Sequence, residues 1–122
     1  MSFTARRLTV IALVVSLFIQ IHIAANAYAA LQAKIAFTRW EDDSREICVM
    51  DADGDNEVRL TDDPGFDAEP SWSPDGNRIA FNRGHDIYIM DSDGRNLTIL
   101  TGGREPAWSP DGTKIAFTRL KR

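Results

Sequence analysis

The chain has 122 residues, of which 43% are hydrophobic and 26% are charged, and its formal net charge is −4. This composition indicates a small globular domain and argues against a disordered or collagen-like chain. The length excludes a large multi-domain enzyme, and the single cysteine, Cys48, excludes an internal disulfide.

Residues 1–30 have the three parts of a secretory signal peptide. A basic start (Arg6, Arg7) is followed by an apolar run over residues 8–19 and by Ala27-Tyr28-Ala29, which fits the A-x-A cleavage pattern. We predict a Sec-type signal that is cleaved near Ala29 or Ala30 and exports the protein to the periplasm or beyond. An uncleaved membrane anchor is the alternative.

Removal of this segment leaves residues 31–122, with 12 basic and 18 acidic residues and hence a net charge of −6. Nucleic-acid binding depends on basic side chains that neutralise phosphates. The acidic balance therefore argues against a nucleic-acid partner.

Three short sequence motifs, which we call words, repeat within residues 31–122. They are [KR]-I-A-F-[TN]-R at 34–39, 78–83 and 114–119, I-x-[VI]-M-D-x-D-G at 47–54 and 87–94, and E-P-x-W-S-P-D-G at 69–76 and 105–112. The words recur at spacings of 36, 40 and 44 residues. Self-similarity at such spacings indicates a repeat architecture.

Each repeat predicts four short strands joined by tight turns. Runs of β-branched and aromatic residues bounded by Asp-Gly turns are typical of antiparallel strands. In the central repeat the expected strands, named a to d, cover residues 70–73, 78–82, 86–90 and 96–101. Strand 86–90 is apolar at consecutive positions, so both faces of the sheet should be covered. Stacked four-stranded sheets of this kind are the blades of a β-propeller.

The words PSWSPDGNRIAF, DIYIMDSDGRNLTILT and PAWSPDGTKIAF resemble the propeller repeats of the TolB family, a periplasmic component of the Tol–Pal system. They are more loosely similar to WD-type repeats and to the propellers of prolyl oligopeptidases and dipeptidyl peptidase IV. The resemblance implies an exported, non-enzymatic protein-binding module. It also implies partners in the cell envelope, such as Pal-like lipoproteins or Tol components.

We therefore predict an all-β partial β-propeller of antiparallel four-stranded blades over residues 31–122, preceded by a helical signal peptide over residues 1–30. Along the chain the strands should run b-c-d, a-b-c-d, a-b, which is about two and a quarter blades. The resemblance implies an additional α/β domain and about six blades in the longer relatives. We interpret the chain as a truncated member or fragment, with self-association through open blade faces as the alternative.

Repeated tryptophans and the single cysteine have structural interpretations. Trp72 and Trp108 occupy equivalent positions and should fill the layers between blades. Cys48 lies within an apolar strand, where a buried, unreactive thiol is expected.

The sequence offers no catalytic constellation and no strong metal motif. There is no G-x-S-x-G elbow, so we predict no catalytic residue, no cofactor and no enzymatic activity. Asp51, Asp53 and Asp55 form a weak Ca²⁺ candidate, because the glycine and the final Glu of an EF-hand loop are misplaced. The alternatives are the propeller portion of a prolyl-oligopeptidase-type serine peptidase and a remnant without independent function.

Residues near the turns that follow the b strands are the candidates for partner binding. They are Trp40, Arg39, Arg83 and His85. Trp40 has no equivalent in the next repeat, where Gly84 takes its place. A surface tryptophan is a candidate binding anchor, although Trp40 could instead shield the edge of the first blade, and the arginines could be ordinary solvated charges.

Overall fold

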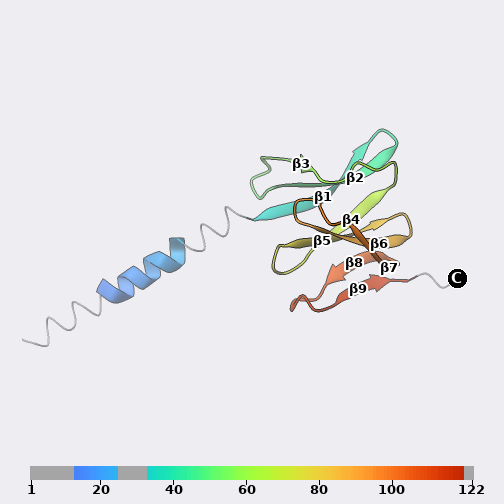
Figure 1. Cartoon of the computed structure of the whole chain (residues 1–122). Helices are drawn as coiled ribbons and strands as arrows, with labels where there is room; N and C mark the ends of the chain where they lie inside the picture. The colour runs from blue at the N-terminus through green and yellow to red at the C-terminus, as the bar shows by residue number, and fades with distance from the viewer. Residues whose placement is uncertain (1–12, 25–32, 120–122) are drawn as a thin grey trace, which may run out of the picture. The chain divides into compact units, whose positions relative to one another are not determined.

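The computed structural model describes residues 13–24 and 33–119 (Figure 1). The chain divides into two units at Ala33–Lys34. In the first unit residues 13–24 form a helix, which lies within the predicted signal peptide. The predicted basic start and cleavage site lie outside the described residues. Within the described ranges, no helix has the length and apolar character needed to cross a membrane.

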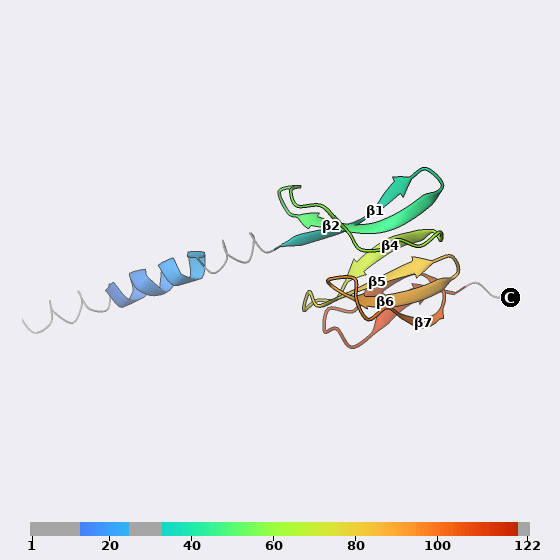
Figure 2. The ribbon, with the colours of Figure 1, turned by 45° about the horizontal axis from the view of Figure 1, so that its top comes forward.

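The second unit consists of antiparallel strands. They are β1 (Lys34–Glu41), β2 (Ser44–Asp51), β3 (Val58–Arg59), β4 (Asp67–Trp72), β5 (Arg78–Arg83), β6 (Asp86–Asp91), β7 (Thr98–Gly102), β8 (Arg104–Trp108) and β9 (Ile115–Thr118). They form three sheets with the orders β1-β2-β3, β4-β5-β6-β7 and β8-β9. Figures 1 and 2 show the sheets following one another in chain order. Along the chain the sheets contain three, four and two strands, and the predicted order was b-c-d, a-b-c-d, a-b.

Two predicted strand boundaries in the central sheet were wrong. The first strand was expected over residues 70–73, but β4 begins at Asp67, and its pairing with β5 shifts register between Ala68 and Ser71. Pro70 cannot donate a ladder hydrogen bond, which favours a bulge at this point. The last strand was expected from Asn96, but β7 begins at Thr98. Asn96 belongs to the preceding turn and has a positive φ of 53°.

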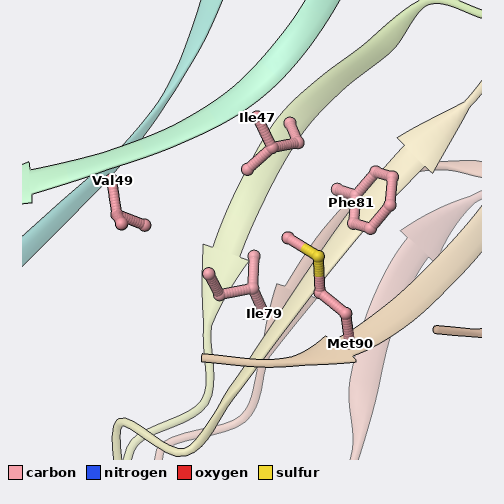
Figure 3. Close-up of a cluster of buried hydrophobic side chains, with 5 residues drawn as sticks. All are labelled: Ile47, Val49, Ile79, Phe81 and Met90. Atoms are coloured by element: carbon pink, nitrogen blue, oxygen red, sulfur yellow. The ribbon is translucent and has the colours of Figure 1, made fainter. Parts of the chain in front are cut away.

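The main core lies between the first two sheets (Figure 3). Ile47 and Val49 of β2 pack against Ile79 and Phe81 of β5 and Met90 of β6. Each such side chain contributes about 1.5–3 kcal/mol when it is buried. Only every second side chain of each strand points into this core. The side chains between them lie on the opposite face of the sheet, where they can pack against another sheet.

The second sheet is also covered on its other face. Ile87 is buried on that face. Gly103 lies close to both Ile87 and β9, because a Cβ added to Gly103 would be 3.2 Å from Cδ1 of Ile87 and 2.6 Å from Cδ2 of Phe117 in β9. Trp72 packs against the main core, and the backbone N–H of Trp108 donates to Oγ of Ser71 at 3.3 Å. The tryptophans therefore lie at sheet-to-sheet contacts, as expected.

Cys48 is fully buried. Burial raises the pKa of its thiol, because the thiolate would lose its hydration. The prediction of a buried, unreactive cysteine agrees with this environment.

The two Trp-Ser-Pro-Asp-Gly words fold into the same turn. Ser73 donates its hydroxyl to Asp75 at 2.6 Å and accepts the N–H of Arg78 at 2.9 Å. Ser109 makes the matching pair of bonds at 2.6 and 3.0 Å. Both hydroxyls therefore hold a turn together, and the carboxylates that accept from them have lowered pKa values.

Candidate partner-binding rim

One end of the sheets gathers the turns that contain most of the predicted binding residues. We define the rim as residues 40–45, 62–66, 83–85 and 103–104. Backbone bonds join these segments: the N–H of Gly84 donates to the carbonyl of Phe66 at 3.3 Å, and that of Gly103 to the carbonyl of His85 at 2.9 Å. Figure 2 shows the β1–β2 and β5–β6 turns at the same end of the unit.

Trp40 lies on the rim in a stack of aromatic rings and a guanidinium group. Its side chain is 68% exposed. The guanidinium carbon of Arg45, its cross-strand neighbour, lies 3.7 Å from the Trp40 ring centroid and 5.5 Å from that of Phe66. Phe66 is also exposed, and its backbone forms a parallel bridge with Arg45. The guanidinium group of Arg45 therefore lies within cation–π distance of both aromatic rings.

Arg45 and Phe66 were not among the predicted residues. A usable signal for Arg45 was present, because Trp40 and Arg45 flank a short hairpin turn and therefore face each other across it. Phe66 lies far from both in the sequence and carries no repeat word, so only the fold brings it to the stack. Stacking an Arg between aromatic faces is favourable by about 0.5–1 kcal/mol per ring at exposed sites.

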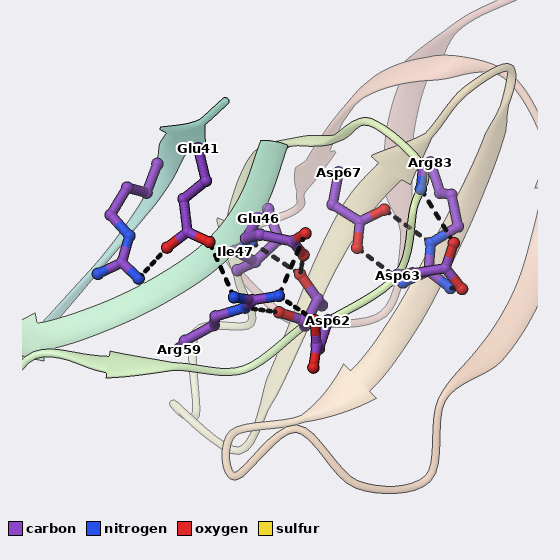
Figure 4. A network of polar contacts seen from close by, with 11 residues as sticks. Glu41, Glu46, Ile47, Arg59, Asp62, Asp63, Asp67 and Arg83 are labelled. Carbon is purple, nitrogen blue, oxygen red and sulfur yellow. Dashed lines mark hydrogen bonds and ion pairs between the residues drawn. The ribbon is translucent and has the colours of Figure 1, made fainter. Parts of the chain in front are cut away.

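Arg83 is bound within the chain (Figure 4). It donates from Nε to Oδ1 of Asp67 at 2.6 Å and from Nη2 to Oδ2 at 2.7 Å, and a longer contact of 3.4 Å reaches Asp63. The paired hydrogen bonds to Asp67 raise the pKa of Arg83. Arg83 therefore anchors the segment that carries Phe66 onto the second sheet.

Arg39 does not join Trp40. Adjacent residues of a strand point to opposite faces, and the guanidinium of Arg39 is held by the carboxylates of Glu41 and Glu57. The hydrogen bonds that Arg39 donates to these two carboxylates raise its pKa. Glu41 also accepts from Arg59 at 2.8 Å.

The same polar network continues to a buried carboxylate (Figure 4). Glu46 is almost fully buried and accepts the hydroxyl of Thr61 at 2.8 Å, while the guanidinium of Arg59 lies 3.5 Å away. Thr61 in turn accepts the N–H of Ile47 at 2.9 Å. These bonds tie the segment after β3 to β2, so this network supports the first sheet.

His85 is exposed on the rim and is joined to the third sheet. Its Nδ1 lies 2.8 Å from Nη2 of Arg104. A guanidinium group can only donate, so Nδ1 of His85 is the acceptor in this contact. His85 and Trp40 thus lie on the same rim, on different sheets.

The calcium candidate forms a turn with internal hydrogen bonds. The carboxylate of Asp51 binds Lys34 and Nδ2 of Asn56, and Asp53 accepts the N–H of Asp55 at 3.0 Å. The equivalent Asp91 turn repeats two of these bonds, from Asn96 to Asp91 and from the N–H of Arg95 to Asp93, although Arg95 replaces Asp55. Among the described residues, no group of three or more His, Cys, Asp or Glu side chains is arranged to hold a metal ion. A Ca²⁺ site here stays a prediction, and heat on calorimetric titration with CaCl₂ would test it.

Consecutive antiparallel sheets, stacked face to face and built from the same repeated words, define a β-propeller repeat protein. A TolB structure from Agrobacterium tumefaciens matches 69% of the chain with a TM-score of 0.65 and 33% identity. TolB from Acinetobacter baumannii matches 75% of the chain with a TM-score of 0.66, and at 21% identity it supports the fold alone.

The family model of the dipeptidyl peptidase IV (DPP IV) N-terminal region matches residues 25–107, and the chain belongs to this family. The Tol-Pal system protein TolB of Desulfosudis oleivorans is 36% identical over an alignment of 62 residues that covers 48% of the chain. The predicted resemblance to TolB-like and DPP IV-like propellers is confirmed, as is the partial propeller fold. The chain spans 14% of that curated relative and 33% and 26% of the two solved chains.

Proposed function

We propose that this chain is an exported, non-enzymatic protein-binding module of the cell envelope and that the rim is its binding surface. The observation that carries the proposal is the exposed Trp40 held against Arg45. Tryptophan and arginine are the residues most enriched at the energetic centres of protein interfaces. An exposed tryptophan that is already held in place loses little conformational freedom when a partner covers it.

Acidic side chains belong to the same rim segments as the stack. Asp42 and Asp43 of the β1–β2 turn are exposed, and the Asp62 side chain is 91% exposed. Such charges attract a partner with basic residues and increase its rate of association. We therefore expect the partner surface to combine basic side chains with an apolar pocket for Trp40.

The proposed partners are envelope proteins, namely Pal-like lipoproteins or Tol components. The support is the similarity to a protein named for the Tol-Pal system. In this proposal residues 1–30 are the signal peptide that directs export to the periplasm, and residues 31–122 are the binding module. Arg39, Arg83 and His85 then support the rim, while Trp40 makes the direct contact.

The test is calorimetric binding of a purified Pal-like lipoprotein domain from the same organism to the chain and to two variants. Trp40→Ala should weaken binding by about tenfold or more, since central tryptophans typically contribute 2 kcal/mol or more. The matched control is Leu97→Ala, because Leu97 is also exposed but adjoins the Asp93–Asn96 turn. Equal affinity of all three proteins would reject Trp40 as the anchor.

A second candidate follows from the family match. In it, the chain is the propeller portion of a peptidase whose catalytic residues lie outside these 122 residues. A hydrolase domain with a G-x-S-x-G elbow encoded in the adjacent sequence would support this candidate. If the adjacent sequence encodes no such hydrolase domain, the peptidase candidate is rejected and the proposed binding module is retained.

A further inference from the structure

The guanidinium group of Arg45 is the cation of the first two sheets' rim turns that has no anionic partner among the described residues. The neighbouring arginines Arg39, Arg59 and Arg83 each contact at least two carboxylates. Arg45 forms no ion pair with any residue that the structure describes, and its Nε–H is shielded from solvent without a hydrogen-bond partner there. The charge of Arg45 is therefore not neutralised, although acidic residues outnumber basic ones in the chain.

Arg45 lies on a hairpin that is longer than its counterpart in the second sheet. The first repeated word recurs after 44 residues and the second after 40, so the β1–β2 hairpin has four more residues than the β5–β6 hairpin. The extra residues allow Trp40 and Arg45 to pair across the hairpin, whereas the equivalent positions hold Gly84 and His85. Of these two hairpins, the first alone carries the aromatic–guanidinium contact.

The contacts of Arg45 hold its side chain in place before a partner binds. Side chains two residues apart share a face of a strand, so Arg45 points to the same side as Ile47, toward the second sheet. Its guanidinium carbon lies 3.7 Å from the Trp40 ring centroid and 5.5 Å from that of Phe66. Stacking uses the face of the guanidinium group and leaves the N–H groups, which lie in its plane, to a ligand. A side chain that is already ordered loses little freedom on binding.

We propose that Arg45 is a carboxylate receptor on the rim. Its two Nη groups bind one carboxylate of the partner, while the apolar neighbours of that carboxylate contact Trp40. The fork of a guanidinium group matches the two oxygens of a carboxylate, and such paired, charge-assisted hydrogen bonds are about twice as strong as neutral ones. This inference rests on the proposed function in using the same rim, and it specifies the chemical group that the rim recognises.

The other charges of the rim define what accompanies the carboxylate. Asp62 and Asp63 are each already in contact with an arginine. Asp42 and Asp43 are exposed and form no ion pair with the described residues. Because these two acids would repel an isolated carboxylate, the partner needs basic side chains beside it. The group that fits is therefore a carboxylate flanked by apolar residues and by Lys or Arg.

A phosphate group fits this surface less well. It also pairs with arginine, but it carries a charge of about −1.5 to −2, so Asp42 and Asp43 repel it more strongly. A carboxylate has two sources in a protein partner, namely an Asp or Glu side chain and the end of a chain. The experiment distinguishes these sources.

Three short peptides serve as probes in NMR titrations of the full chain. The first is acetyl-Lys-Leu-Glu-Leu-Lys-amide, the second has Gln in place of Glu, and the third is the Gln peptide with a free C-terminal carboxylate. The Glu peptide should bind about tenfold more tightly than the amidated Gln peptide, because it adds a charge-assisted pair of hydrogen bonds. It should also shift the side-chain N–H resonance of Arg45, which is identified by its loss in Arg45→Lys.

Protein variants assign the preference to Arg45. Arg45→Gln should bind the Glu and Gln peptides equally. Arg45→Lys keeps the charge but not the fork, so it should retain only a preference of about twofold to threefold, and it serves alone if Arg45→Gln alters the circular dichroism spectrum. The matched control is Arg95→Gln, which changes the net charge equally. The Arg95 side chain is 83% exposed and lies on the Asp93–Asn96 turn, outside the rim, so this variant should keep the tenfold preference.

Three outcomes would overturn the proposal. They are equal affinity of the parent chain for the Glu and Gln peptides, an unchanged preference in the Arg45 variants, and displacement of the Glu peptide by inorganic phosphate at lower concentration than by acetate. Tighter binding of the free C-terminal peptide than of the Glu peptide would support the receptor and assign it to a chain end.

Failure of this inference is distinguishable from failure of the proposed function, because the peptides contain no envelope protein. If the Pal-like domain does not bind, the proposed function is rejected while the peptide result stands. If the peptides show no carboxylate preference, this inference is rejected even where that domain binds through Trp40.

Discussion

Arg83 and Asp67 form a bidentate pair in which Nε and Nη2 each donate to one carboxylate oxygen, at 2.6 and 2.7 Å. The carboxylate is fully buried and the arginine side chain is mostly buried. Because Asp67 begins β4 and Arg83 ends β5, the pair closes one end of the central sheet and fixes the approach of the segment that carries Phe66.

Replacing Arg83 with Met should therefore lower the free energy of unfolding by about 3 kcal/mol, because the buried carboxylate loses its partner. Urea denaturation followed by circular dichroism measures this. The double variant Arg83→Met, Asp67→Leu should recover most of the loss, since no charge is then left uncompensated. A double variant as unstable as the single one would contradict this account.

The Ser-Pro-Asp-Gly turns should make stability sensitive to acid. Hydrogen bonds from Ser109 and Thr113 lower the pKa of Asp111 from 3.8 to about 2. A carboxylate with a lowered pKa stabilises the fold above its unfolded value and loses that contribution as the pH falls through its folded value. Between about pH 4 and pH 2, the Asp111→Asn variant should therefore lose less stability than the parent chain. Parallel curves of unfolding free energy against pH would disprove the assignment.

Cys48 should be inert to thiol reagents in the folded protein. It is fully buried and its pKa is raised by burial, so little thiolate forms at neutral pH. Ellman's reagent should label it slowly in buffer and rapidly in denaturing urea. Equally rapid labelling in both would show that the first sheet opens readily.

Two turn glycines provide a matched test of packing between neighbouring sheets. Gly54 and Gly94 have positive φ angles of 92° and 85°, so alanine at either costs about 1–2 kcal/mol of backbone strain. An added Cβ at Gly54 meets nothing within 4 Å, whereas at Gly94 it would lie 3.0 Å from the carbonyl oxygen of Leu60. Gly94→Ala should therefore be the more destabilising in thermal unfolding. Equal effects would mean that this turn is not packed against Leu60.

The repeated words made the strand order predictable, because each word corresponds to one strand or one turn and its copies fold alike. They also located Trp72 and Trp108 at the contacts between sheets. The start of β4 was missed because residues 67–69 have no strand-like composition, and only pairing with β5 through a bulge makes them part of the sheet.

The candidate site was less accessible from sequence than the fold. Trp40 stood out as a departure from the repeat, but its stack depends on Phe66, which lies beyond β3 and is placed by the Arg83–Asp67 pair. Arg39 and Arg83 looked alike as strand-terminal cations. Their side chains prove to have different carboxylate partners, which spacing alone does not specify.

The pairing of β4 to β7 strictly in chain order has a consequence for how the protein acquires its structure. Every contact within that sheet closes a short loop, so little chain entropy opposes its formation. In repeat arrays, order spreads from a stable unit to its neighbours, and this sheet is the one flanked on both sides. We expect the chain to nucleate there and to open from its outer sheets, so amide hydrogen exchange should be slowest in β5 and β6.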